Sequence, residues 1–246
     1  MNLVLVAENE ILDDNTVIID DSRRLKSISS ILKSQNNSTL RAGIINGALG
    51  YAEIIKINSE NGAIKSIVLN TAVLTELPPK PLDLVLICAM QRPKTLKKIL
   101  QTATAMGVKT FYIIETWKVE KSYWTSSILD EQELKQQLLL GLEQCVDTIL
   151  PEIVIKRAFK PFVEDELPSI INGRISYVAH PYSKKEEFFF SSADALTLAI
   201  GPEGGFTEYE VEKFKDAGFI PISMGKRILR TEFAVTALIS LLTSSL

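Results

Sequence analysis

The stretch AIGPEGGFTEYEVEKFKDAGF, residues 199–219, identifies the architecture of this chain. It begins at the end of an apolar run that predicts a buried strand. Thr207 and Glu210 have the Thr-x-x-Glu spacing of a capping box, and Gly218 follows where a helix would end in glycine. We therefore expect residues 201–205 to form a strand-to-helix loop, at the edge of a parallel sheet where α/β proteins bind ligands. Three glycines in this loop would let a ligand approach the main chain closely.

The segments around this loop alternate between strand and helix patterns from residue 82 onward. Such alternation predicts an α/β fold, a parallel sheet covered by helices on both faces. Strands are predicted over residues 82–90, 110–114, 152–158, 175–179, 195–200 and 220–224. Helices are predicted over residues 95–106, 131–148, 162–171, 207–217 and 231–246.

The first third of the chain has short strand-like runs separated by turn residues. Strands are predicted over residues 3–6, 16–19, 40–45, 51–57 and 63–69, with one helix over 22–32. Asn46-Gly47 and Asn61-Gly62 are typical of hairpin turns. We interpret residues 1–75 as a small β-rich or barrel domain, residues 76–81 as a proline-rich linker, and residues 82–246 as the α/β domain.

Composition limits the classes of function. The net charge of −3 argues against a uniformly basic nucleic-acid coat, although a local basic surface is compatible with it. The chain has one histidine and two cysteines far apart in the sequence, which is not the spacing of a metal site. Both cysteines, Cys88 and Cys145, lie in apolar stretches, as is typical of proteins in a reducing compartment. The start lacks a basic signal-peptide region, and no apolar run approaches the roughly 20 residues of a membrane helix. We expect a soluble, cytoplasmic protein.

Three segments at predicted strand ends are candidate ligand loops: Ala179-His180-Pro181, residues 201–205 and residues 224–232. The Rossmann G-x-G-x-x-G and P-loop G-x-x-x-x-G-K-[ST] patterns are both missing. The chain is therefore not expected to bind a dinucleotide or a nucleoside triphosphate in those ways.

The segment GPEGGFTEYEVEKFKDAGFIPISMGKRILRTE, residues 201–232, resembles the signature of the RsmE-type ribosomal RNA uridine-N3 methyltransferases, within the SPOUT superfamily. Gly201–Gly205 match that family's GPEGG loop. Gly225 and the run Ile228–Glu232 match its second motif, Leu-Gly-x-x-Ile-Leu-Arg-Thr-Glu-Thr. The stretches DDSRRLKSISSILK, ATAMGV and LEQCVDTILPEI extend the likeness over more of the chain.

This resemblance implies a PUA-like β-barrel followed by a SPOUT-type knotted α/β domain. It implies S-adenosyl-L-methionine as cofactor and small-subunit (16S) ribosomal RNA, free or in the assembled subunit, as substrate. It also implies a homodimer formed through the knotted domain, so the apolar face of residues 234–242 belongs either to that interface or to the core alone. The implied cofactor-binding residues are His180, Pro181, Ile200, Gly201, Pro202, Glu203, Gly204, Gly205, Met224, Gly225, Ile228, Leu229, Arg230 and Thr231.

Methylation of uracil N3 requires loss of a proton, and negative charge then spreads onto the base oxygens. Arg230 is the candidate cation for that charge, unless it forms an ion pair with Glu203 or Glu232. Glu203 and Glu232 are the candidate bases, and each could instead orient its loop. His180 is either a direct participant or a structural residue.

Two clusters of basic residues are candidates for phosphate contacts on RNA, and either could equally be a solvated face. On the first interpretation, charge reversal at Arg23 and Arg24 would weaken RNA binding. The candidate RNA-binding residues are Arg23, Arg24, Lys26, Lys33, Arg92 and Lys94.

Several positions differ from the family pattern, among them Ser27, Ala105, Asp147 and Phe233, where polar or basic side chains are usual. The cofactor motif is nearly intact. Two alternatives therefore stay open. One is a ribose 2′-O-methyltransferase or another SPOUT RNA methyltransferase, and the other is a paralogue that binds RNA or cofactor without catalysis.

Overall fold

The computed structural model describes residues 2–34, 38–182 and 195–243. Contacts divide the chain into two units, Met1–Lys80 with Leu139–Leu150, and Pro81–Leu138 with Pro151–Leu246. Sequence pattern grouped residues 139–150 with the α/β domain. Their contacts lie instead in the first unit, where the Asn2 and Leu3 N–H groups donate to Glu143 O at 3.0 and 3.1 Å. Among the described residues, no helix combines the length and apolar character needed to cross a membrane.

A five-stranded sheet and one α-helix form most of the first unit. The elements are β1 (Val4–Val6), η1 (Glu8–Glu10), β2 (Thr16–Ile19), α1 (Ser22–Ser34), β3 (Thr39–Ile44), β4 (Leu49–Glu60) and β5 (Ala63–Asn70). The strand order is β1-β3-β4-β5-β2, antiparallel except for the pair β1 and β3. Asn46 and Asn61 have the left-handed φ values, 61° and 50°, that tight hairpins use, so both predicted hairpins are confirmed. Leu25 and Ile28 of α1 pack into the core of this unit.

The second unit contains a six-stranded sheet. Its strands are β6 (Leu82–Ala89), β7 (Val108–Ile114), β8 (Glu152–Lys156), β9 (Ile175–Ala179), β10 (Leu196–Ile200) and β11 (Ile220–Ile222). Their order is β11-β9-β10-β6-β7-β8, and every pair is parallel, which confirms the predicted sheet. Because all strands run the same way, their carboxyl ends lie at one edge, with β9, β10 and β11 as neighbours.

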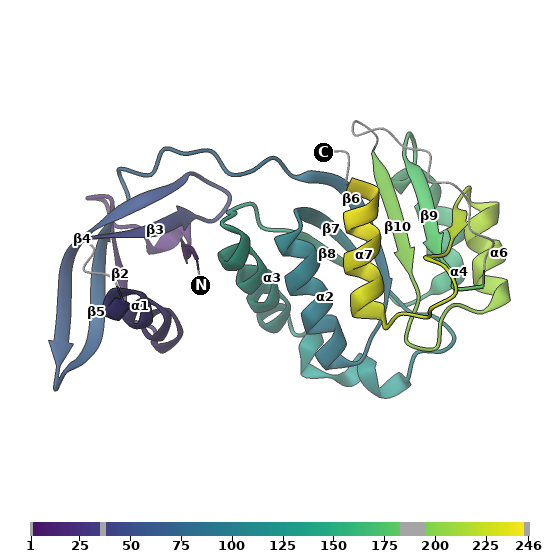
Figure 1. Cartoon of the computed structure of the whole chain (residues 1–246), viewed down its shortest axis with the longest axis horizontal. Helices are drawn as coiled ribbons and strands as arrows, with labels where there is room; N and C mark the ends of the chain where they lie inside the picture. The colour runs from purple at the N-terminus through teal and green to yellow at the C-terminus, as the bar shows by residue number, and fades with distance from the viewer. Residues whose placement is uncertain (1, 35–37, 183–194, 244–246) are drawn as a thin grey trace. The chain divides into compact units, whose positions relative to one another are not determined.

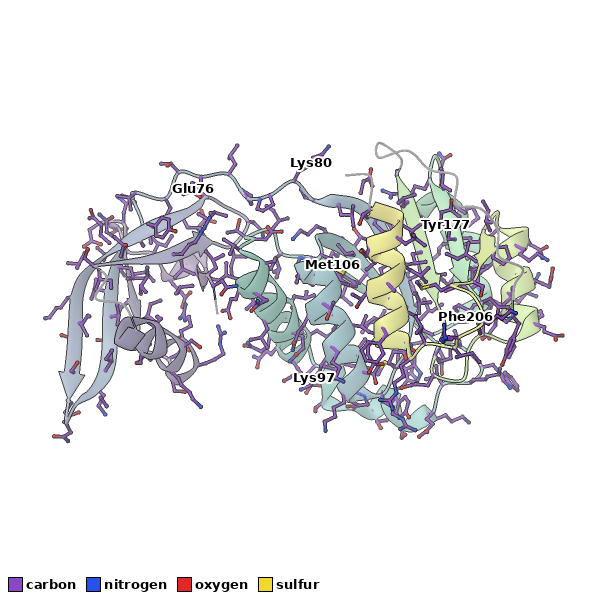
Figure 2. The ribbon with its side chains drawn as sticks, in the orientation of Figure 1. Glu76, Lys80, Lys97, Met106, Tyr177 and Phe206 are labelled. Carbon is purple, nitrogen blue, oxygen red and sulfur yellow. The ribbon has the colours of Figure 1, made fainter. Side chains whose placement is uncertain are left out.

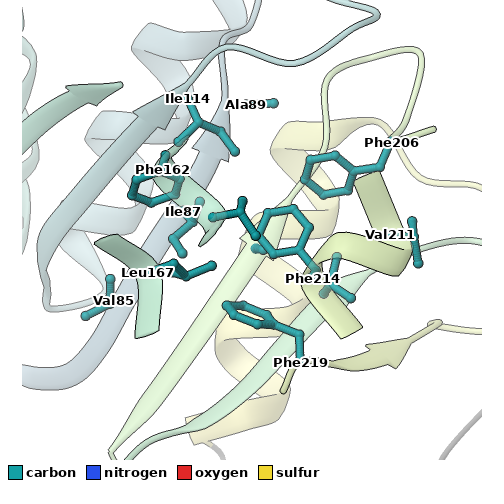
Figure 3. Close-up of a cluster of buried hydrophobic side chains, with 13 residues drawn as sticks. Val85, Ile87, Ala89, Ile114, Phe162, Leu167, Phe206, Val211, Phe214 and Phe219 are labelled. Carbon is teal, nitrogen blue, oxygen red and sulfur yellow. The ribbon is translucent and has the colours of Figure 1, made fainter. Parts of the chain in front are cut away.

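Helices cover both faces of this sheet (Figure 1). The helical elements from residue 93 onward are α2 (Pro93–Ala105), η2 (Lys121–Thr125), η3 (Ser127–Leu129), α3 (Glu131–Cys145), α4 (Phe159–Pro161), η4 (Phe162–Glu166), α5 (Leu167–Ile170), α6 (Glu208–Asp216) and α7 (Thr231–Thr243). Side chains alternate along β6, so Val85 and Ile87 pack with Phe162, Leu167 and Phe214 on one face (Figure 3). On the opposite face α2 packs beside α7.

The structure differs from the predicted helices in two places. The helix predicted over residues 162–171 is confirmed, but it is not a regular α-helix: α4, a π-helical turn η4 and α5 follow one another without a break over residues 159–170. Pro168 has no N–H for the carbonyl four residues earlier, so the main chain widens before it. Helix α3 ends at Cys145 rather than at Thr148, because the next residue, Val146, has a left-handed φ of 63°. Periodicity does not predict η2 and η3, which are too short to show it.

Candidate functional site

The three predicted ligand loops come together at the carboxyl edge of the second unit's sheet. They line a cavity of about 730 Å³, a volume in the usual range of small-molecule sites. Every residue that the resemblance implies as cofactor-binding lies in its wall, and so does Glu232. The wall also includes Arg92, Thr95, Lys118, Tyr182, Phe206, Ser223, Arg227, Ala234 and Leu238.

The Gly201–Gly205 loop closes as a tight turn at the end of β10. The Gly205 N–H donates to Pro202 O at 2.8 Å, and Gly205 has a φ of 70°, a conformation that favours glycine. A Cβ on Gly201 would lie 2.9 Å from the Phe206 nitrogen, so glycine alone fits there without a shift of the main chain. Phe206, labelled in Figure 2, packs against Phe214 in the core. The loop therefore presents main chain to the cavity from a fixed support.

Local sequence sets both ends of α6 as predicted. Thr207 Oγ1 accepts from the Glu210 N–H at 3.2 Å, and the Glu210 carboxylate accepts from the Thr207 N–H at 2.7 Å, which completes the capping box. At the other end Gly218, with a φ of 98°, lets the Phe219 N–H reach a carbonyl of the last turn. The buried Glu210 carboxylate also accepts from the Trp117 N–H at 2.7 Å, so it fixes the segment after β7.

The charged candidates in the cavity wall have different surroundings. Glu203 accepts a hydrogen bond from the Arg92 N–H at 3.1 Å, so its carboxylate joins the loop to the start of α2. Glu232 is 13% exposed and pairs with Lys98 at 3.5 Å. Arg230 is exposed, and among the described residues its guanidinium has no ion-pair partner. Neither Glu203 nor Glu232 therefore neutralises Arg230 in this structure.

His180 lies in the cavity wall. Its main-chain N–H donates to Ile222 O at 2.9 Å, which fixes it beside β11. Burial lowers the pKa of the ring below its ordinary value of 6.5, and the nearby Lys118 ammonium lowers it further. The lowered pKa favours the neutral form of the ring at neutral pH.

Two residues that the sequence reasoning missed contact the Gly201–Gly205 loop. Lys118 Nζ donates to Gly204 O at 3.0 Å, and its stem passes 3.2 Å from the place that a Cβ on Gly204 would take. Gln91 is fully buried and donates to Gly201 O at 2.9 Å. Both residues follow the carboxyl end of a buried strand, β7 for Lys118 and β6 for Gln91. A polar residue at that place is the signal that could have found them.

The candidate RNA-binding residues lie in different environments. Arg23 bonds both carboxylate oxygens of Glu143, at 2.8 and 2.7 Å. Arg24 pairs with Glu10 and Asp21, and its side chain is only 11% exposed. These two arginines therefore have structural partners inside the first unit. The others are Lys26, Arg92 and Lys94, which are exposed, and Lys33, whose side chain lies outside the described residues.

Comparison with known proteins agrees with this geometry. Residues 78–243 match the family of RNA methyltransferase domains, and the chain belongs to that family. It is 29% identical over 240 residues to the ribosomal RNA small subunit methyltransferase E of Treponema pallidum, a match that covers 96% of this chain and 88% of that protein. It is 27% identical over 248 residues to the ribosomal RNA small subunit methyltransferase E 1 of Borreliella burgdorferi, covering 100% of this chain and 98% of that protein.

Among solved structures, the chain is similar to a ribosomal RNA small subunit methyltransferase E from Neisseria gonorrhoeae bound to S-adenosyl methionine. The TM-score is 0.72 at 19% identity, with 99% of this chain and 97% of that chain covered. This likeness extends through both units. The predicted α/β fold class and the resemblance to RsmE-type enzymes are thereby confirmed.

Proposed function

We propose that this chain transfers the methyl group of S-adenosyl-L-methionine to N3 of a uridine in 16S ribosomal RNA, in the cytoplasm. The observation that carries this proposal is the cavity built by three loops in a member of the RNA methyltransferase domain family. Relatives named for the small-subunit RNA support the substrate, and the similar structure with bound S-adenosyl methionine supports the cofactor.

The residues of the cavity wall fit this cofactor. The glycines of the Gly201–Gly205 loop leave main-chain N–H and C=O groups accessible to a polar ligand. Ile200, Leu229 and Leu238 give the wall an apolar part suited to an adenine ring. When bound, the cofactor supplies an activated methyl group on a positively charged sulfur.

The charged residues of the wall have two proposed roles in N3 methylation, proton acceptance and charge stabilisation. The N3 proton must leave, and Glu203 and Glu232 are the carboxylates proposed to accept it. Negative charge on the uracil oxygens would be stabilised by Arg230, which no described carboxylate neutralises. Neutral His180 offers a hydrogen-bonding group that adds no positive charge beside the sulfonium cofactor.

The larger assembly follows from the same proposal. The first unit is a PUA-like barrel that contacts ribosomal RNA, and the second contains a trefoil knot and forms a homodimer. The resemblance to RsmE-type enzymes, matched over nearly the whole chain, supports these assignments. Lys26, Arg92 and Lys94 are the exposed cations proposed to contact phosphates.

The test is methyl transfer from labelled cofactor to small ribosomal subunits that lack the modification, followed by nucleoside analysis. 3-Methyluridine is the expected product. A 2′-O-methylated nucleoside would instead identify a sugar-modifying enzyme of the same superfamily. Cofactor binding by calorimetry without any methylated product would identify a non-catalytic paralogue.

A further inference from the structure

Gln91 is a fully buried polar residue just beyond the end of β6. Its Nε2 donates to two main-chain carbonyls, Ala89 O at 2.8 Å and Gly201 O at 2.9 Å. Because both partners can only accept, the side-chain nitrogen must face them. One NH₂ group thus joins the end of β6 to the first residue of the Gly201–Gly205 loop.

These bonds lie where the strand ladder has ended. The parallel pairing of β10 with β6 stops at Ile200 and Cys88, so the side chain of Gln91 extends the link between the strands into the loop. Two other donors hold the same loop, the Arg92 N–H on Glu203 and Lys118 Nζ on Gly204. Of the three, Gln91 is the donor that is completely buried.

Packing alone does not explain an amide at this position. Gln91 Oε1 is buried, and within the described residues no hydrogen-bond donor reaches it. Burial of an unsatisfied oxygen is unfavourable, and an apolar side chain of similar length would avoid it. The two hydrogen bonds that the NH₂ group donates offset this cost. This indicates that the amide is present because it joins the Ala89 and Gly201 carbonyls.

We infer that Gln91 is a positioning residue that holds the Gly201–Gly205 loop in the conformation that binds cofactor. This inference rests on the proposed function for its cofactor, S-adenosyl-L-methionine. Gln91 does not line the cavity, so it acts through the main chain of Gly201 rather than by touching the ligand.

The test compares Gln91→Met, which keeps the size but removes both bonds, with the matched control Gln137→Met. Gln137 is also buried and hydrogen-bonded in the second unit, where its Nε2 donates to Glu133 at 2.6 Å, away from the cavity. Both variants should lower Tm. Only Gln91→Met should raise the Kd and KM for S-adenosyl-L-methionine, by about tenfold, while kcat at saturating cofactor changes less than KM.

A second readout does not depend on the cofactor. In the full chain without ligand, amide hydrogen exchange over residues 201–206 should be faster in Gln91→Met than in wild type, and unchanged in Gln137→Met. If Gln91→Met fails to fold, Gln91→Asn replaces it, since its shorter amide cannot span both carbonyls.

The outcomes separate this inference from the proposed function. The inference is overturned if amides 201–206 exchange at the same rate in Gln91→Met as in wild type. It is also overturned if wild-type protein binds the cofactor and Gln91→Met binds it with the same Kd. If wild-type protein binds no S-adenosyl-L-methionine, the proposed function fails. Faster loop exchange in the variant would then still establish that Gln91 positions the loop, but not for this cofactor.

Discussion

Arg24 and Arg230 differ in what surrounds the guanidinium group. Arg24 is almost buried, pairs with Glu10 and Asp21, and also donates to Leu5 O at 3.1 Å. Arg230 is exposed in the cavity wall, with no ion-pair partner among the described residues. A buried, paired guanidinium contributes to the fold, whereas an exposed and unpaired one is available to a ligand.

Arg24→Met should lower the free energy of unfolding by about 3 kcal/mol, because Glu10 and Asp21 lose their partner. Burial raises the pKa of both carboxyls, but hydrogen bonds from Arg24 outweigh it, so both pKa values lie below the ordinary 4.5 and 3.8. The stability from these pairs is therefore present above pH 4.5 and is lost as pH falls through the lowered pKa values. Urea unfolding at about pH 7 and about pH 3 measures this, and the difference from wild type should shrink in acid.

A control for Arg24→Met is Lys65→Met, which removes an ion pair with Glu60 between exposed side chains of the same unit. It should cost less than about 1 kcal/mol. If the loss in Arg24→Met were the same at both pH values, the pairing with Glu10 and Asp21 would not be its cause.

Arg230→Met should lower kcat for methyl transfer by about 100-fold, the usual effect of removing a group that stabilises transition-state charge. Tm should stay within about 2 °C of wild type, because the substitution breaks no described ion pair. Lys226→Met is the control, since Lys226 is exposed in the same loop but lies outside the cavity wall. Equal kcat values for the two variants would exclude Arg230 from the reaction.

At the scale of an element, α6 joins local and long-range contacts at one carboxylate. Its first turn is set by Thr207 and Glu210, three residues apart. The same Glu210 accepts a hydrogen bond from Trp117, which is 93 residues away. The start of α6 and the segment after β7 therefore form one network beside the Gly201–Gly205 loop.

Thr207→Ala should cost about 1 kcal/mol of unfolding free energy, as loss of an N-cap usually does. Glu210→Ala should cost more, about 3 kcal/mol, because the Thr207 and Trp117 N–H groups lose their acceptor. Glu212→Ala, which removes an exposed pair with Lys215 on the same helix, should cost less than about 0.5 kcal/mol. Denaturant unfolding measures all three, and equal costs for Thr207→Ala and Glu210→Ala would mean that the Trp117 bond contributes nothing.

At the scale of the whole molecule, the second unit leaves a large aromatic side chain exposed on its last helix. Phe233 on α7 is 58% exposed and lies outside the cavity wall, so a ligand in the cavity would not cover it. A second copy of the chain would cover it in the proposed homodimer. Exposed aromatic residues of this kind are typical of interface centres.

Sedimentation equilibrium should therefore give about twice the chain mass of 27.3 kDa. Phe233→Asp should shift the protein to the mass of one chain, because it places a charge in the interface. Tyr51→Asp is the control, since Tyr51 is equally exposed on β4 of the first unit and should leave the dimer intact. A wild-type mass of one chain would refute the homodimer.

Local pattern was sufficient for the elements around the cavity. The apolar run of β10, the Thr207–Glu210 capping box and Gly218 act over a few neighbouring residues, so their effect can be predicted without the rest of the chain. Parallel strands place the three ligand loops at one edge of the sheet, but the loops meet because β9, β10 and β11 are neighbours in the strand order. Local pattern predicted the helical run over residues 162–171 but not the π-helical turn η4 that precedes Pro168 within it.

The partners of individual side chains depend on the assembled fold. Gln91 reaches Gly201 across 110 residues, and Arg23 reaches Glu143 across 120. Such contacts follow from the order of the strands and the packing of the helices, which no short stretch of sequence specifies. This is why sequence placed Arg23 and Arg24 among the candidate RNA contacts and passed over Gln91. The identity of the loops is a local property, whereas the support that holds them is a property of the tertiary structure.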